Sequence, residues 1–248
     1  MLNVQLTWWT ARPLSRNYNV SLRLLDGDGL VFGQFDGQPG YGFLPSSGWP
    51  AGQWVNDWLT IPQPTLENAP YALVAILYDT ESGANVLTRR LGELDRSLTF
   101  WPQTHEMMLP EGLAGETAVF ITESTPIIQL AGWQKQPDGL TLYWQSLAAL
   151  PANYTRFLHV TDPATGEMLA QVDGYAMGDS YPTSQWQPGE IIADTIRLDW
   201  SSLPNDAAIW VGWYENLGSV FPRLTAVAPD GSPFPDNRVP LKQITINN

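Results

Sequence analysis

The loop at 181–190, with the sequence YPTSQWQPGE, contains residue types suited to ligand binding. An exposed face of Trp186 or Tyr181 could stack on the C–H groups of a sugar ring. Asp173 or Asp194, together with Gln171, could then accept hydrogen bonds from its hydroxyl groups and donate hydrogen bonds to them. The alternative is a structural corner, in which Trp186 fills the end of a pair of sheets and the Pro and Gly residues shape the turn. A related loop at 44–53, LPSSGWPAGQ, favours the corner, because the two loops share few polar residues.

Trp54 and Trp58 form a second candidate binding site. They belong to a strand-like segment, WVNDW, and side chains four residues apart on a strand point to the same face. Packing between domains is the favoured interpretation of these two rings, and binding a ligand together is the alternative. Trp8 and Trp144, by contrast, lie in the middle of alternating apolar segments and are predicted to be core residues.

Residues suited to catalysis are scarce. The chain has two His and no Cys residues, and it contains no Gly-x-Ser-x-Gly, Walker, Gly-x-Gly-x-x-Gly or His-Glu-x-x-His motif. His159 is expected at the surface, on the strand face opposite Leu158. Asp26 and Asp28 begin like a calcium loop, but the further ligands are missing, so a hairpin turn is predicted. We therefore predict a non-catalytic protein without metal or cofactor; a glycoside hydrolase, which needs two suitably spaced carboxylates, is a less favoured alternative.

The composition excludes several classes of protein. Asp and Glu number 25 against 12 Lys and Arg, a net charge of −13, whereas nucleic-acid binding requires a basic surface. Disulfide bonds and zinc–cysteine sites require Cys. No apolar run is long enough to cross a membrane, and the first residues lack the pattern of a signal peptide. If Met1 is the native start, these features would indicate a cytoplasmic protein.

One sequence pattern occurs twice, which indicates two related domains. Residues of the first copy match residues of the second in the same order along the chain. The matched pairs are Leu6/Leu142, Trp8/Trp144, Asn17/Asn153, Tyr18/Tyr154, Leu22/Leu158, Asp26/Asp162, Gly29/Gly166, Gln34/Gln171, Asp36/Asp173, Gly37/Gly174, Pro45/Pro182, Ser47/Ser184, Trp49/Trp186, Gly52/Gly189, Asp57/Asp194 and Tyr78/Tyr214.

Both copies show the pattern of β-strands. Short alternating segments are separated by Gly, Pro, Asn and Asp turns, and no window shows a sustained helical period. The pattern predicts an all-β chain of two tandem antiparallel β-sandwiches, immunoglobulin-like or fibronectin-III-like, at 1–108 and 117–248.

The two copies differ at their first strand. The segment 127–134 reads as the first strand of the second copy, and its counterpart in the first copy would precede Met1. Either the first sandwich lacks this strand, or Met1 is not the native start. The second possibility is favoured, because an open sheet edge promotes aggregation.

The second copy, and more weakly the first, resembles the β-sandwich modules that follow the membrane-spanning part of bacterial glycosyltransferases of the dolichyl-phosphate-mannose-mannosyltransferase-like class. The resemblance rests on the segments 142–144 (LYW), 157–160 (FLHV), 170–174 (AQVDG), 181–190 and 211–214 (VGWY). It implies an extracytoplasmic or cell-envelope location and an accessory role beside a membrane glycosyltransferase region.

The sequence therefore predicts a module that binds or presents glycan at the cell envelope, without direct membrane insertion. The alternative is a structural spacer or protein-interaction module that positions a neighbouring enzyme.

Overall fold

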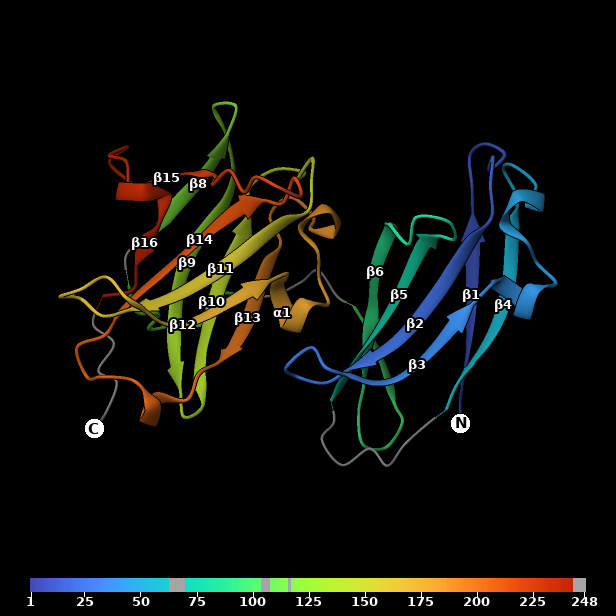
Figure 1. The fold of residues 1–248 in the computed structure, drawn as a ribbon, viewed down its shortest axis with the longest axis horizontal. Helices are drawn as coiled ribbons and strands as arrows, with labels where there is room; N and C mark the ends of the chain where they lie inside the picture. Colours follow the sequence, from blue (N-terminus) through green and yellow to red (C-terminus); the bar gives the residue numbers. More distant parts are fainter. Residues whose placement is uncertain (63–69, 104–107, 116, 243–248) are drawn as a thin grey trace. The chain divides into compact units, whose positions relative to one another are not determined.

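A computed structural model describes residues 1–62, 70–103, 108–115 and 117–242 of the chain (Figure 1). It divides into two compact units, Met1–Gln103 (domain 1) and Thr104–Asn248 (domain 2). The sequence had placed the end of the first domain at 108 and the start of the second at 117. Ala114 already pairs with Trp133 in a β-bridge, so part of the predicted linker contributes to domain 2.

Domain 1 consists of two antiparallel sheets. Among the described residues, one sheet contains the two strands β1 (Leu2–Trp9) and β4 (Trp54–Ile61), and the other has the order β3-β2-β5-β6-β7. The strands of the larger sheet are β2 (Tyr18–Leu25), β3 (Val31–Gly37), β5 (Tyr71–Asp79), β6 (Asn85–Leu94) and β7 (Phe100–Pro102). The short helical turns η1 (Pro39–Gly42) and η2 (Ser46–Gly48) precede β4.

Domain 2 also has two antiparallel sheets, with the orders β13-β10-β9-β8-β15 and β12-β11-β14-β16. The first sheet contains β8 (Ala118–Thr122), β9 (Thr125–Gln136), β10 (Gly139–Ser146), β13 (Ile191–Arg197) and β15 (Thr225–Val227). The second contains β11 (Tyr154–Thr161), β12 (Met168–Gly174), β14 (Ala208–Glu215) and β16 (Val239–Pro240). The short helical segments are α1 (Ala176–Asp179), η3 (Thr183–Gln185), η4 (Trp200–Ser202) and η5 (Pro235–Asn237).

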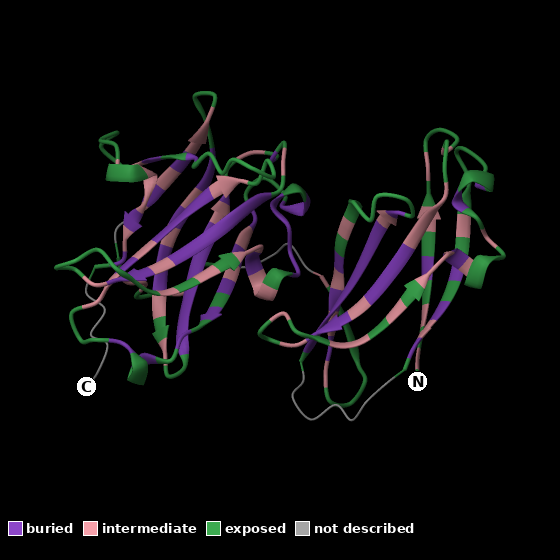
Figure 2. Cartoon of the chain, in the orientation of Figure 1, coloured by how far each residue is buried: buried purple, intermediate pink, exposed green. Residues whose placement is uncertain are grey.

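Each domain has one main core to which both of its sheets contribute. In domain 1 the cluster joins Leu6 and Leu59 of the small sheet to Leu22 and Leu73 of the large one. Figure 2 shows buried and exposed positions alternating along many of the strands, as expected for sheets with one face turned inward. The prediction of an all-β chain with antiparallel sheets is confirmed, and the shared cores fit a sandwich arrangement.

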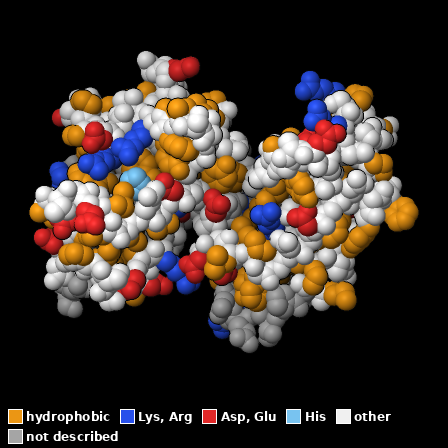
Figure 3. Space-filling view, viewed as in Figure 1, with side chains coloured by type: hydrophobic (Ala, Val, Ile, Leu, Met, Phe, Trp, Pro, Cys, Tyr) orange, Lys and Arg blue, Asp and Glu red, His pale blue; other side chains and the backbone are white. Residues whose placement is uncertain are grey.

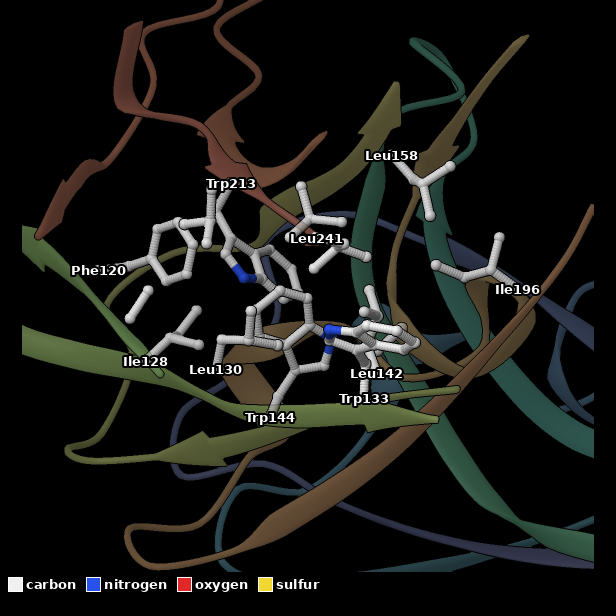
Figure 4. Close-up of a cluster of buried hydrophobic side chains, with 14 of the residues drawn as sticks. Phe120, Ile128, Leu130, Trp133, Leu142, Trp144, Leu158, Ile196, Trp213 and Leu241 are labelled. Carbon is white, nitrogen blue, oxygen red and sulfur yellow. The ribbon is translucent and has the colours of Figure 1, made fainter. Parts of the chain in front are cut away.

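The core of domain 2 is built around tryptophan (Figure 4). Trp144 on β10 and Trp213 on β14 meet edge to face, with ring centroids 5.0 Å apart, and Phe120 on β8 packs 5.9 Å from Trp144. Aromatic pairs with this geometry add to the stabilisation from burial. Trp144 is fully buried, as its place in the strand pattern predicted, whereas Trp8 is only half-buried.

Two strands at the ends of domain 2 differ from the prediction. The predicted strand at 127–134 lies within β9, but no sequence pattern indicated β8 before it. The hairpin joining them turns at Glu123 and Ser124, which both have positive φ although neither is the glycine that normally marks such a turn. Near the other end of the domain, the short strand β15 was also not predicted. The last strand, β16, ends at Pro240, and residues 243–248 lie outside the described part.

The Asp26 turn is a hairpin, as predicted. The carboxylate oxygen Oδ1 of Asp26 accepts hydrogen bonds from the backbone N–H groups of Asp28, at 3.0 Å, and Leu30, at 2.9 Å. The matching Asp162 accepts from Ala164 and Thr165 in the same manner. These carboxylates bind their own turns, which is the usual role of Asp at such positions.

A third turn of this kind, at Asp95 between β6 and β7, makes domain 1 sensitive to acid. Hydrogen bonds from the Ser97 side chain and the Trp101 indole, followed by the Thr99 backbone, lower the pKa of Asp95 to about 2. Because the folded-state pKa is depressed, this stabilisation is present above the ordinary Asp pKa of 3.8 and is lost as the pH falls towards 2.

We expect the thermal midpoint of domain 1 to fall as the pH is lowered through this range. The Asp95→Asn variant should be less stable near neutral pH and should show a smaller fall on acidification. Thermal unfolding of both proteins at a series of pH values measures the difference, and parallel pH profiles would contradict this role for Asp95.

Candidate functional site

The outer face of the β1–β4 sheet is the most distinctive surface of domain 1. The two strands pair in antiparallel register, with Trp9 opposite Trp54, Thr7 opposite Asn56 and Gln5 opposite Trp58. Strand alternation turns these side chains outward and turns Leu6 and Leu59 into the core. In Figure 3, hydrophobic side chains project from the rim of domain 1 where Figure 1 places β1 and β4.

Three tryptophans on this face are exposed. Trp9 is 52%, Trp54 69% and Trp58 61% accessible to solvent. The rings of Trp9 and Trp54 lie 6.4 Å apart at an interplanar angle of 46°. Trp58 follows Trp54 by four residues, which places it roughly 13 Å further along the strand. The three side chains thus form a row of large flat apolar surfaces.

Uncharged polar groups lie between and beside the rings. The Thr7 hydroxyl donates to Oδ1 of Asn56 at 3.1 Å, and the Thr60 hydroxyl donates to Oδ1 of Asn3 at 2.9 Å. The strands contain a single charged residue, Asp57, which is fully buried on the inner side. The face therefore offers amide and hydroxyl groups for hydrogen bonding without an electrostatic field from its own side chains.

The corresponding face of domain 2 has different chemistry. The alignment of the two copies places Gln145, Ile191 and Thr195 where domain 1 has Trp9, Trp54 and Trp58. Thr195 instead shares a hydrogen bond of 3.0 Å with Thr141 on the neighbouring strand. The row of tryptophans is therefore a property of domain 1 and not of the shared pattern.

Trp186 and Tyr181, the residues singled out in the 181–190 loop, are core residues. Trp186 is 2% exposed and packs edge to face on Trp213, with ring centroids 5.4 Å apart. Its indole N–H donates to the Tyr181 carbonyl, and the buried Tyr181 hydroxyl donates to the Glu190 carboxylate at 2.9 Å. Neither ring presents a face to a ligand, so the sugar-binding interpretation of this loop is corrected to the structural corner. The matching Trp49 indole likewise donates to the Leu44 carbonyl.

Asp173 lies apart from the other predicted site residues, on β12 at the outer face of its sheet. Its carboxylate accepts from the Gln171 amide at 3.0 Å and the Tyr214 hydroxyl at 3.3 Å, and it lies 3.4 Å from Nε2 of His159. Partial burial raises the pKa of Asp173, but the interactions with His159 and Gln171 outweigh it and hold the pKa below its usual value. His159 was predicted at the surface; it lies on the outer face but packs against Phe157, and its side chain is 12% exposed.

The structure thus separates the five predicted residues into three places. Only Trp54 and Trp58 lie together on an exposed face. Trp9 is the member of this face that the sequence analysis did not select, because Trp54 and Trp58 were preferred for their spacing on one strand. The signal was present: if Trp8 points inward on a strand, Trp9 must point outward.

Searches for related proteins and for metal sites add no further candidate. No protein-family model, curated protein or solved structure matches the chain. Within the described residues, no group of three or more His, Asp or Glu side chains gathers as a metal-binding set. No helix in the same part of the chain is long and apolar enough to cross a membrane.

Proposed function

We propose that the chain is a non-catalytic carbohydrate-binding module, and that domain 1 binds glycan through the outer face of β1 and β4. The observation that carries this proposal is the row of exposed Trp9, Trp54 and Trp58 beside Thr, Asn and Gln side chains. The apolar C–H face of a pyranose ring packs well against an indole, and its hydroxyl groups need hydrogen-bond partners of the kind that amides supply.

The charge of the chain indicates a neutral glycan. The binding face has no exposed charged side chain, while the chain as a whole has a net charge of −13. An acidic polysaccharide would be repelled by this charge without a basic group on the face to compensate. A flat sheet face also suits a polymer chain better than a small molecule, which normally binds in a cavity.

The resemblance to modules beside membrane glycosyltransferases fits the same proposal. A module that holds neutral glycan near such an enzyme would be located outside the cytoplasm, at the cell envelope. Domain 2, whose matching face lacks the tryptophans, would act as the spacer that positions domain 1.

A screen of the intact chain against a panel of neutral and acidic polysaccharides tests the proposal. We expect retention on at least one neutral polymer and none on the acidic ones. Absence of binding to every glycan at high protein concentration would contradict it, as would binding that survives removal of the tryptophans on this face.

The affinity for the neutral polymer is expected to be nearly independent of salt. Coulombic attraction is screened over about 10 Å at 0.1 M ionic strength, whereas stacking and hydrogen bonding to an uncharged ligand are not. Binding isotherms measured at low and high sodium chloride concentrations give the comparison. A steep fall in affinity with salt would show that charged groups outside this face bind the ligand.

A further inference from the structure

The strand β1 has one free edge among the described residues. It pairs along its whole length with β4, and its sheet contains no third strand. The matching strand of domain 2, β10, is paired on both sides, with β13 and with β9. The backbone N–H and C=O groups on the free side of β1 are therefore placed to form a further antiparallel ladder.

The free edge has none of the usual features that prevent pairing. The sequence of β1, LNVQLTWW, contains no charged residue and no Pro. Natural edge strands are usually protected by Lys, Pro, a β-bulge or a covering segment. β1 also pairs with β4 in continuous register, without a bulge to twist its edge away.

An apolar groove of about 1110 Å³ runs along this edge. It lies between β1 and the strands β5, β6 and β7 of the opposite sheet, and its walls include Val4, Leu6, Ala75, Leu91 and Leu94. Arg89 is the one charged residue among the described residues that line it. At its rim the apolar side chains of Leu87, Leu98 and Phe100 are exposed. The groove thus opens the core of domain 1 to solvent on one side.

Domain 2 fills the corresponding place with its own strand. There β9 lies antiparallel to β10, with Trp133 opposite Leu142 and Leu130 opposite Trp144. Ile128 and Leu130 of β9 are completely buried in the core of domain 2. Because Leu6 and Trp8 match Leu142 and Trp144, the groove has the shape and polarity to accept apolar side chains at the same two positions of an added strand.

The two matched tryptophans, Trp8 and Trp144, differ in how far they are buried. Trp144 contacts Phe120 of β8, the strand paired with β9, and is fully buried. Trp8 makes the same kind of inward contacts, with its indole donating to Asp57 and its ring stacked 5.7 Å from Trp49, yet it stays half-buried. Its uncovered surface is what a strand in the groove would bury.

We propose that the free edge of β1 and its groove bind an extended strand from a polypeptide segment outside residues 1–248. The strand would lie antiparallel to β1, add backbone hydrogen bonds to its edge, and place apolar side chains in the groove, as β9 does in domain 2. Such strand addition takes affinity from main-chain hydrogen bonds and specificity from pockets for alternate side chains. This site is the edge of the small sheet, and it adjoins the outer face proposed to bind glycan, because Gln5, Thr7 and Trp9 belong to that face and also line the groove.

The chain itself supplies the probe for a test. A fluorescein-labelled peptide with the sequence of β9, TPIIQLAGWQKQ, is titrated into the intact chain and followed by fluorescence anisotropy. We expect saturable binding, together with slower amide hydrogen exchange at residues 2–9. A peptide with Leu130→Pro should bind at least about tenfold more weakly, because proline removes a backbone donor and fixes φ.

Two matched substitutions on one strand locate the peptide. Leu87→Arg places a charge in the groove at a residue that is already 44% exposed, so the fold is preserved, and peptide affinity should fall about tenfold or more. The neighbouring Val86→Arg, at an exposed residue outside the groove lining, should leave affinity unchanged.

Four results would overturn the proposal. The first is absence of saturable binding by the β9 peptide, and the second is equal affinity for the two arginine variants. The third is slower amide hydrogen exchange in domain 2 only, which would mean that the peptide replaces β9 of domain 2 and does not bind β1. Dimerisation of the chain alone, with residues 2–9 already protected, would also contradict it by identifying a second copy as the occupant.

Discussion

Replacing Asp194 with alanine is expected to lower the free energy of unfolding of domain 2 by about 3–5 kcal/mol. The Asp194 carboxylate is fully buried, and its Oδ2 lies 3.0 Å from Nε of the buried Arg156. It also accepts from the Met177 backbone at 2.8 Å and the Trp144 indole at 3.4 Å. Removing the Asp194 carboxylate breaks the ion pair of the buried Arg156 guanidinium. The free-energy cost of taking that guanidinium out of water is then no longer offset by the ion pair.

Asp57 in domain 1 provides a matched comparison. It is equally buried and makes the same two hydrogen bonds, from the Gly40 backbone at 2.8 Å and the Trp8 indole at 3.3 Å. The residue aligned with Arg156, however, is Val20, so no ion pair is broken. We expect Asp57→Ala to destabilise domain 1 by about 1–3 kcal/mol, the range for buried donors left unpaired.

Urea unfolding followed by amide hydrogen exchange measures the stability of each domain separately. If Asp194→Ala lowers the free energy of unfolding by no more than Asp57→Ala does, the buried ion pair does not have the stabilising role expected here. The double variant that combines Asp194→Ala with Arg156→Met should regain part of the lost free energy of unfolding, because it leaves no unpaired charge at this site.

Truncating Trp54 or Trp58 to alanine is expected to weaken binding to the neutral glycan about 30-fold or more, equivalent to about 2 kcal/mol. Large aromatic side chains that are exposed in the free protein contribute strongly to the binding free energy when a partner buries them. Each indole would here be covered by a sugar ring. Trp9→Ala should have an effect in the same direction, because its ring lies beside that of Trp54. Isothermal titration with a soluble oligosaccharide measures the affinities.

Trp101 is the control for this series. It is 60% exposed, which matches Trp58, but it lies on β7 of the other sheet. Trp101→Ala should leave glycan affinity unchanged, although loss of the hydrogen bond from its indole to Asp95 will cost some stability. Equal losses from Trp58→Ala and Trp101→Ala would indicate a general effect on folding and would contradict a binding face on β1 and β4.

Several features of the fold follow from local sequence. Alternation of apolar and polar residues predicts strands, and Asp in a tight turn predicts a hairpin, because both depend on residues close together in the chain. Trp144 could be identified as a core residue in this way. The strand β8 could not, because its hairpin turns at Glu123 and Ser124, whose positive φ values have no signature in those residue types.

The candidate site was only partly predictable. Alternation shows that Trp54 and Trp58 share a face, but not whether that face is turned inward or outward. For the loop residue Trp186 there is no periodicity to use, and the sequence favoured a structural corner only through comparison with the loop at 44–53. Asp57 and Asp194 match in sequence and in their hydrogen bonds, yet only Asp194 has a buried Arg as its partner.

The sequence by itself therefore determined the all-β class and turns such as the Asp26 hairpin, since these depend on short-range patterns. The tertiary structure alone decided which of the candidate tryptophans are exposed. Burial depends on which distant segments cover a surface, and the two copies differ there: β8 and β9 close the core of domain 2, while the same side of domain 1 is an open groove.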